Sequence, residues 1–158
     1  SPQQLVGRLA EAKARAVEKR MTYDNAIIIG SDQVAVCDGN ILGKPGNREN
    51  AVRQLSSFIG KTVTFYTGLA VFNTEAQQCE VRVEPFEVEF RQLTAEEIER
   101  YVELENPFDC AGSFKSEGLG ISLFSGLKGN DPNTLIGLPA IALLDMLRTH
   151  GINPLNKD

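Results

Sequence analysis

Apolar residues near the start of the chain recur at helical spacing. They are Leu5, Leu9, Ala12 and Ala16. Charged side chains fall on the opposite side of the same helical wheel, so residues 3–20 are predicted to form an amphipathic helix. Lys13 breaks this pattern, because it lies between Leu9 and Val17 on the predicted inward side. It is either a lysine that snorkels at the edge of the apolar stripe or one that meets a partner.

Extended segments follow this first helix. β-branched and alternating apolar residues predict strands at 26–29, 34–37, 61–73 and 79–93. The polar stretch TEAQQ joins the last two as a hairpin loop, and Pro85 marks an edge or a bulge.

Capping residues indicate three further helices. Asn47 is the predicted N-cap of the first. Thr94 and Glu97 have the spacing of a capping box at the start of the second. The third begins at Pro139 and stops after His150.

Together these elements predict an α/β fold, a mixed twisted sheet with flanking helices. A chain of 158 residues can bury a self-sufficient core, and no linker or repeat divides it, so a single domain over residues 1–158 is expected. Residues 108–137 are rich in Gly, Ser and Asn and have weak periodicity. Loops of that length inside a domain are usually functional.

The composition argues against several classes of function. A net charge of −5 and a pI near 5.0 do not suit a broad basic surface for polymeric nucleic acid. No apolar run reaches the roughly 18 residues of a membrane span and no signal peptide opens the chain, so a cytoplasmic protein is expected. Three widely spaced cysteines indicate neither a disulfide framework nor a zinc site.

Histidine-based catalysis is excluded as well. His150 is the only histidine, and a dipole interaction in the last helical turn explains it without a function. The chain has neither GxGxxG after a strand nor GxxxxGK[ST], so dinucleotide and Walker-type phosphate loops are not supported. Carboxylate and lysine chemistry remains, with at most an oxygen-liganded cation.

Asp32 is the first candidate for such chemistry. It follows a buried isoleucine run and a Gly-Ser bend, so its carboxylate is expected at the edge of the sheet and partly desolvated. A charge there needs a cation or several donors. The alternative is an Asx-type turn, in which the carboxylate accepts from nearby backbone N–H groups.

Two lysines complete the candidate site. Pro45 restrains the backbone of Lys44, which is therefore presented from a stiff turn, and Lys13 arrives from the first helix. One carboxylate and two lysines suit the cleavage of a polyphosphate. The lysines and a divalent metal neutralise phosphate oxygens, and the carboxylate binds the metal or deprotonates water.

Three motifs carry a resemblance to a known family. GSDQV at 30–34, GKP at 43–45 and AGSFKSEG at 111–118, in this order, resemble the Maf family of nucleoside triphosphate pyrophosphatases. The resemblance runs over essentially all 158 residues. Gln33 and Glu117 look like the YceF-type branch, which is selective for 7-methyl-GTP. Each motif alone is weak, but their joint occurrence is specific.

The resemblance implies hydrolysis of a nucleoside triphosphate to the monophosphate and pyrophosphate. Water would be activated at Asp32 together with a divalent metal, Mg²⁺ or Mn²⁺, which Asp32 binds. A Maf-like fold, related to Ham1 and ITPase proteins, with a deep cleft and often a homodimer is implied too. The implied site residues are, for catalysis, Asp32, Lys44 and Lys13, and, for substrate binding, Gln33, Glu117, Lys115 and Ser113.

The assignment of Glu117 to the base has a physical sense of its own. Guanine presents two donors, N1–H and the exocyclic amine, and a carboxylate accepts from both. Methylation at N7 makes the ring cationic, which an anion stabilises further. A neutral glutamine would suit a pyrimidine edge better. The alternative is a solvated glutamate on a glycine-rich loop.

The chain departs from the family pattern at its start. Maf proteins begin with a strand, a Ser-x-Arg-Arg phosphate loop and an acidic residue that helps to hold the metal, and none of these precedes the first helix here. The expectation is that this segment is missing upstream. A second function therefore stays open, a nucleotide-binding regulator of cell division that hydrolyses little.

Overall fold

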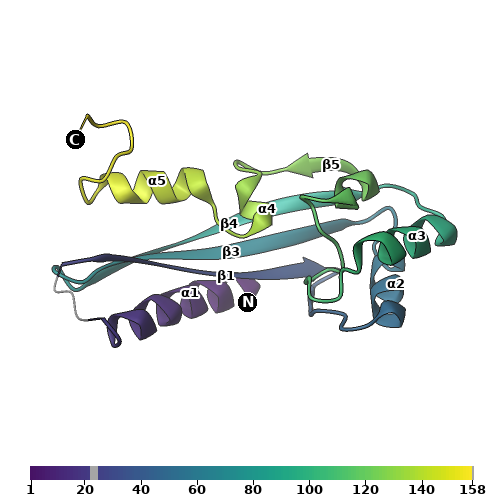
Figure 1. Ribbon diagram of the computed structural model, residues 1–158, viewed down its shortest axis with the longest axis horizontal. Coiled ribbons are helices and arrows are strands. Elements are labelled where there is room, and N and C mark those ends of the chain that lie inside the picture. Colours follow the sequence, from purple (N-terminus) through teal and green to yellow (C-terminus); the bar gives the residue numbers. More distant parts are fainter. Residues whose placement is uncertain (22–24, 158) are drawn as a thin grey trace. The chain divides into compact units, whose positions relative to one another are not determined.

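The computed structural model describes residues 1–21 and 25–157. Within these residues, five strands form one sheet in the order β2-β1-β3-β4-β5. Figure 1 labels β1, β3, β4 and β5 of this sheet. The elements in chain order are α1 Pro2–Glu18, β1 Ile27–Cys37, β2 Asn40–Leu42, α2 Arg48–Ser56, β3 Thr62–Asn73, β4 Gln78–Phe90, α3 Ala95–Glu105, the 3₁₀ helix η1 Leu119–Leu123, β5 Phe124–Lys128, α4 Asn133–Ile136 and α5 Ala140–Arg148.

The strands of this sheet run antiparallel. The β1–β2 and β4–β5 ladders are both antiparallel. Ala26, just before β1, exchanges hydrogen bonds with Thr74, just after β3, and β3 and β4 are neighbours joined by a short loop. The α/β class with flanking helices is confirmed, and the sheet that we expected to be mixed is antiparallel.

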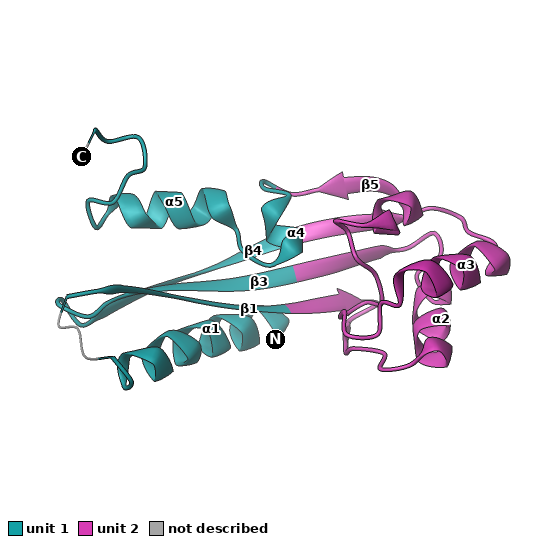
Figure 2. Cartoon of the chain, viewed as in Figure 1, with its two compact units in different colours: residues 1–33, 66–85, 130–158 teal, residues 34–65, 86–129 magenta. Residues whose placement is uncertain are grey.

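Two compact units share the long strands (Figure 2). Unit 1 comprises residues 1–33, 66–85 and 130–158, and unit 2 comprises residues 34–65 and 86–129. In unit 1, α1 covers one face of the strands and α5 lies on the other (Figure 2). The single domain and the deep cleft stay predictions.

Helix α1 forms as predicted but buries a different side. Ser1 caps it in a capping box with Gln4. Its buried residues are Val6, Gly7, Ala10 and Ala14. Leu9 and Val17, which were expected to face inward, are 36% and 47% exposed. The predicted inward side was therefore wrong, because small residues rather than large ones make the contact surface.

The small residues let α1 approach the strands closely. A Cβ added to Gly30 of β1 would stand 2.2 Å from the carbonyl oxygen of Ala10, and one added to Gly68 of β3 would stand 2.2 Å from that of Val6. Such distances leave no room for any side chain at either glycine. Helix and strands are thus in backbone contact, and Asp32 is brought next to α1.

Replacing Gly30 with alanine is expected to lower the free energy of unfolding by about 2 kcal/mol, because the added methyl group must push α1 away from β1. Urea denaturation followed by circular dichroism measures the change. Gly43→Ala is the matched control, since a Cβ there meets no atom within 4 Å. Equal midpoints for the two variants would contradict the close packing.

Unit 2 is built around five phenylalanines. Neighbouring rings have centroids 5.2–5.5 Å apart in tilted or edge-to-face pairs. The members are Phe58, Phe65, Phe90, Phe114 and Phe124. Because Phe114 belongs to the AGSFKSEG motif, this cluster anchors the motif to the strands.

The predicted helix starts are confirmed. Asn47 accepts from the backbone N–H of Asn50, and Thr94 and Glu97 form the expected capping box. The third helix, predicted between Pro139 and His150, is α5. Residues 26–37 contain one strand, β1, where two were predicted.

The stretch 108–137 is more regular than expected, since it contains η1, β5 and α4. These elements are short and have no clear sequence period, which is why the pattern missed them. In the part of the chain that the structure describes, helices fall short of the length and apolarity that crossing a membrane requires. The three cysteines are free, and burial raises the pKa of each thiol.

Candidate active site

Asp32 and Lys13 form an ion pair in unit 1. The Nζ atom of Lys13 lies 2.6 Å from Oδ1 of Asp32 and also donates to the carbonyl oxygen of Ser31 at 3.3 Å. The side chain of Asp32 is 19% exposed and that of Lys13 58% exposed. The carboxylate is therefore held in a partly buried position, with its cation toward solvent.

This pair resolves two alternatives left open by the sequence. Among the described residues, Asp32 accepts no hydrogen bond from a neighbouring backbone N–H, so the Asx-turn alternative does not apply. Lys13 has a specific partner, so it is not merely a lysine that snorkels at the edge of an apolar stripe. The sequence prediction that these two charges meet is borne out by their geometry, whereas their catalytic roles stay predictions.

Gln33 leaves β1 on the face opposite to Asp32, as alternation along a strand requires. Its Nε2 donates to Oγ1 of Thr67 at 2.9 Å and to the carbonyl oxygen of Thr134 at 2.8 Å. Ser31, on the same face, donates to the carbonyl oxygen of Gly137 at 2.9 Å. One amide hydrogen of Gln33 thus fixes α4 against β1, and the other bonds to Thr67 of the neighbouring strand β3.

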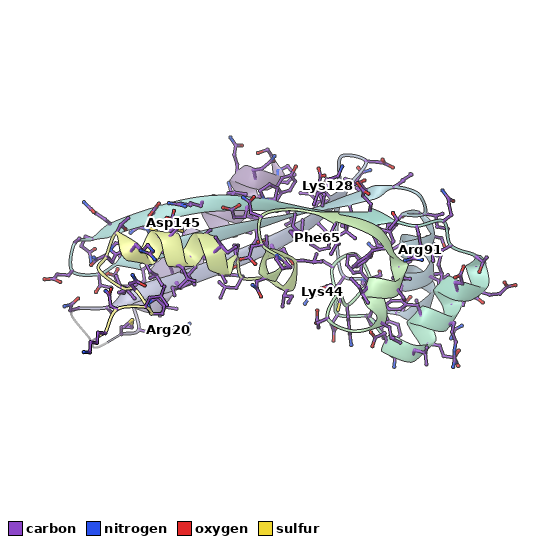
Figure 3. The ribbon with its side chains drawn as sticks, turned by 90° about the horizontal axis from the view of Figure 1, so that it is seen from above. Arg20, Lys44, Phe65, Arg91, Lys128 and Asp145 are labelled. Atoms are coloured by element: carbon purple, nitrogen blue, oxygen red, sulfur yellow. The ribbon has the colours of Figure 1, made fainter. Side chains whose placement is uncertain are left out.

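Lys44 lies in unit 2, in the loop between β2 and α2 (Figure 3). The loop is tied at three points: Gln54 Nε2 donates to the carbonyl oxygen of Gly43 at 3.3 Å, Asn50 Nδ2 donates to that of Pro45 at 3.1 Å, and the Gly46 N–H donates to that of Phe108 at 3.0 Å. The side chain of Lys44 is exposed and borders a cavity of about 450 Å³. These contacts hold the loop that carries the Lys44 ammonium, as expected from the restraint that Pro45 places on the Lys44 backbone.

The AGSFKSEG motif is also held from several sides. The backbone N–H of Lys115 donates to the hydroxyl of Tyr101 at 2.8 Å. Ser113 is fully buried, and its hydroxyl donates to Oε1 of Gln54. Glu117 is exposed and accepts from Oγ of Ser116 at 3.2 Å. The motif therefore presents a carboxylate to solvent from an anchored loop.

The site residues fall into two groups. Asp32, Lys13 and Gln33 belong to unit 1, and Lys44 and the AGSFKSEG motif belong to unit 2. Within unit 1 the structure brings Asp32 and Lys13 together and places Gln33 on the other face of β1. The meeting of Asp32 with Lys44 stays a prediction.

Sequence reasoning missed Gln54 and Tyr101. Both lie on helices, and their partners are far away along the chain, Ser113 for Gln54 and Lys115 for Tyr101. Burial raises the pKa of Tyr101, so its hydroxyl stays protonated at neutral pH. Many helices carry a polar residue beside their apolar stripe, as Gln54 stands before Leu55. This feature is therefore too common to have singled out Gln54 or Tyr101 from the sequence.

Asp131 is a buried carboxylate with a structural explanation. It is 3% exposed and accepts from the backbone N–H groups of Asn133 and Ile141, both at 2.8 Å. Burial alone would raise the pKa of this carboxyl group, but these hydrogen bonds outweigh it and hold the pKa below its usual value. Asp131 therefore fixes the start of α5.

The sequence of this chain matches a known protein family and a curated relative. A profile of the Maf family, described as "Maf-like protein", matches residues 1–150. The chain belongs to the Maf family. It is 59% identical, over 155 residues, to a curated protein of Colwellia psychrerythraea (strain 34H / ATCC BAA-681) named "7-methyl-GTP pyrophosphatase". The alignment covers 98% of this chain and 76% of that relative.

The GSDQV motif of this chain offers one carboxylate, that of Asp32, to a divalent cation. Mg²⁺ is typically held by one or two carboxylates together with phosphate oxygens of the substrate. Asp32 supplies such a carboxylate, and Lys13 occupies only Oδ1 of it. In the described ranges, no three His, Cys, Asp or Glu side chains gather into a metal cage. A cation held at Asp32 would take its other ligands from water or from phosphate oxygens.

Proposed function

We propose that this chain hydrolyses 7-methyl-GTP, or a related modified or canonical nucleoside triphosphate, to the monophosphate and pyrophosphate. The observation that carries the proposal is the 2.6 Å ion pair between Lys13 and Asp32, which holds a partly buried carboxylate beside an ammonium. Membership of the Maf family supports the reaction class. The name of the relative at 59% identity supports the substrate.

The reaction breaks the anhydride bond between the α- and β-phosphates. The oxygen of a water molecule bonds to the α-phosphorus, and pyrophosphate leaves with the electron pair of the broken bond. Asp32 takes the proton of the water, and it is also the residue that would hold the divalent cation, Mg²⁺ or Mn²⁺. The cation would neutralise phosphate oxygens when bound. Lys13 and Lys44 are each proposed to bind phosphate oxygens and so to favour the leaving pyrophosphate.

Recognition of the base is assigned to the AGSFKSEG motif. Glu117 carries an exposed carboxylate that accepts from N1–H and the exocyclic amine of guanine. Lys115 is proposed to support substrate binding from the same motif, whereas the fully buried Ser113 can do so only indirectly, through Gln54. Gln33 is proposed to influence base selection by fixing the α4 region against β1, because its amide hydrogens are already engaged. The homodimer and the cytoplasmic location stay proposals as well.

A panel of triphosphates tests this function. Pyrophosphate release is measured with Mg²⁺ or Mn²⁺ for 7-methyl-GTP, GTP, UTP and dTTP. We expect the highest kcat/KM for 7-methyl-GTP and no release when the metal is removed with a chelator. Calorimetry of the same nucleotides is the companion measurement. Tight binding of a nucleotide without turnover would overturn the proposal in favour of the nucleotide-binding regulator.

A further inference from the structure

One side-chain amide joins the loop of Lys44 to the AGSFKSEG motif. Gln54, half-buried on α2, donates from Nε2 to the carbonyl oxygen of Gly43 at 3.3 Å. Its Oε1 accepts from the hydroxyl of Ser113, 59 positions further along the chain. Both contacts lie within unit 2.

Chemistry fixes the direction of this amide. A backbone carbonyl oxygen can only accept, so the NH₂ group of Gln54 must face Gly43. The oxygen of the amide is then left for Ser113, whose hydroxyl must donate to it. A flipped amide would set two acceptors against each other at Gly43, and the arrangement therefore has one low-energy state.

Ser113 is placed to act on Gln54 and not on a ligand. Its side chain is fully buried and its φ of +66° lies in the left-handed region, which serine adopts rarely. Phe114, the next residue of the motif, packs its ring against Phe65 and Phe124. The backbone at Ser113 is therefore held in one conformation with the hydroxyl aimed at α2.

We propose that Gln54 is a positioning residue for Lys44, and that Ser113 works through Gln54 rather than by touching the substrate. The pair makes the loop of Lys44 and the AGSFKSEG motif move as one body, so that phosphate binding and base recognition are linked. This inference rests on the proposed function in two respects, the role of Lys44 in binding the triphosphate and the role of the AGSFKSEG motif in recognising the base.

The kinetic test uses Gln54→Met, Ser113→Ala and the double variant. Each single change is expected to raise KM for the triphosphate roughly 10-fold, the effect of losing one neutral hydrogen bond, and to leave kcat within about threefold. Because the two residues act through one contact, the double variant is expected to match the worse single variant. Ser56→Ala is the control, since the hydroxyl of that exposed serine donates to the carbonyl oxygen of Val52 in the same helix, and its KM should stay within about twofold.

A second readout does not depend on activity. Hydrogen exchange of the Gly46 amide, which donates to Phe108, is expected to become at least 10-fold faster in both single variants while the melting transition stays cooperative. Unchanged exchange, or KM effects that multiply in the double variant, would overturn the inference. A wild-type protein without pyrophosphate release refutes the proposed function, whereas the exchange result still decides whether Gln54 and Ser113 hold the loop.

Discussion

Replacing Asp32 with asparagine is expected to lower kcat for pyrophosphate release about 1000-fold. The amide has no charge with which to hold a cation and cannot take a proton from water, and removal of a general base typically costs 10²–10⁴-fold. The amide oxygen can still accept from Nζ of Lys13, which now lies 2.6 Å from the carboxylate, so β1 and α1 keep their contact. Steady-state kinetics with 7-methyl-GTP and Mg²⁺ measures the effect.

The chain offers a matched control for this substitution. Asp38 pairs with Lys61 at the same distance, 2.6 Å, and its side chain is 63% exposed. Asp38→Asn removes a carboxylate from an equally short ion pair, so its kcat should stay within about twofold of the wild type. Equal rates for the wild type and Asp32→Asn would end the proposed mechanism, whatever the control shows.

The need of Asp32 for a partner could be anticipated, because an acidic residue that follows an apolar run is costly to bury alone. Lys13 was the predicted partner because it was assigned to the inward side of α1, but that side is exposed, so the pairing is confirmed although this reason for it was wrong. The side of α1 that packs inward could not be inferred in the same way. It depends on Gly30 and Gly68, which lie outside α1 on two different strands, admit the helix backbone and favour Val6 and the alanines over Leu9.

The supporting contacts of the site lay outside the reach of sequence patterns. The hydroxyl of Ser113 suggested a ligand contact, as it stands in a motif with Lys115 and Glu117. The fold instead buries it against Gln54. Gln33 follows Asp32 directly, yet alternation along β1 sends the two side chains to opposite faces. Helix starts were predictable because capping is local, whereas these contacts depend on the folded chain.

Replacing Glu117 with glutamine is expected to lower the preference for 7-methyl-GTP over UTP about 100-fold, measured as the ratio of the two kcat/KM values. The carboxylate accepts two hydrogen bonds from guanine, but the amide turns a donor toward one of the guanine donors. Loss of a hydrogen bond to a charged group costs about 1.5–3 kcal/mol, which corresponds to roughly 10–150-fold. The cationic 7-methylguanine also loses its counter-charge, so GTP should suffer less than 7-methyl-GTP.

Two comparisons separate base recognition from a general loss of charge. Glu103→Gln removes an exposed carboxylate from α3, where it pairs with Arg100 at 3.4 Å, and should leave the substrate ranking intact. In Glu117→Gln, kcat for UTP should stay near the wild-type value, because the change does not touch Asp32 or the lysines. A variant that keeps the wild-type ranking of 7-methyl-GTP, GTP and UTP would show that Glu117 is a solvated loop residue. Glu117 is the carboxylate that the anchored motif presents to solvent. If it does not contact the base, selectivity for guanine would have to come from residues outside this motif.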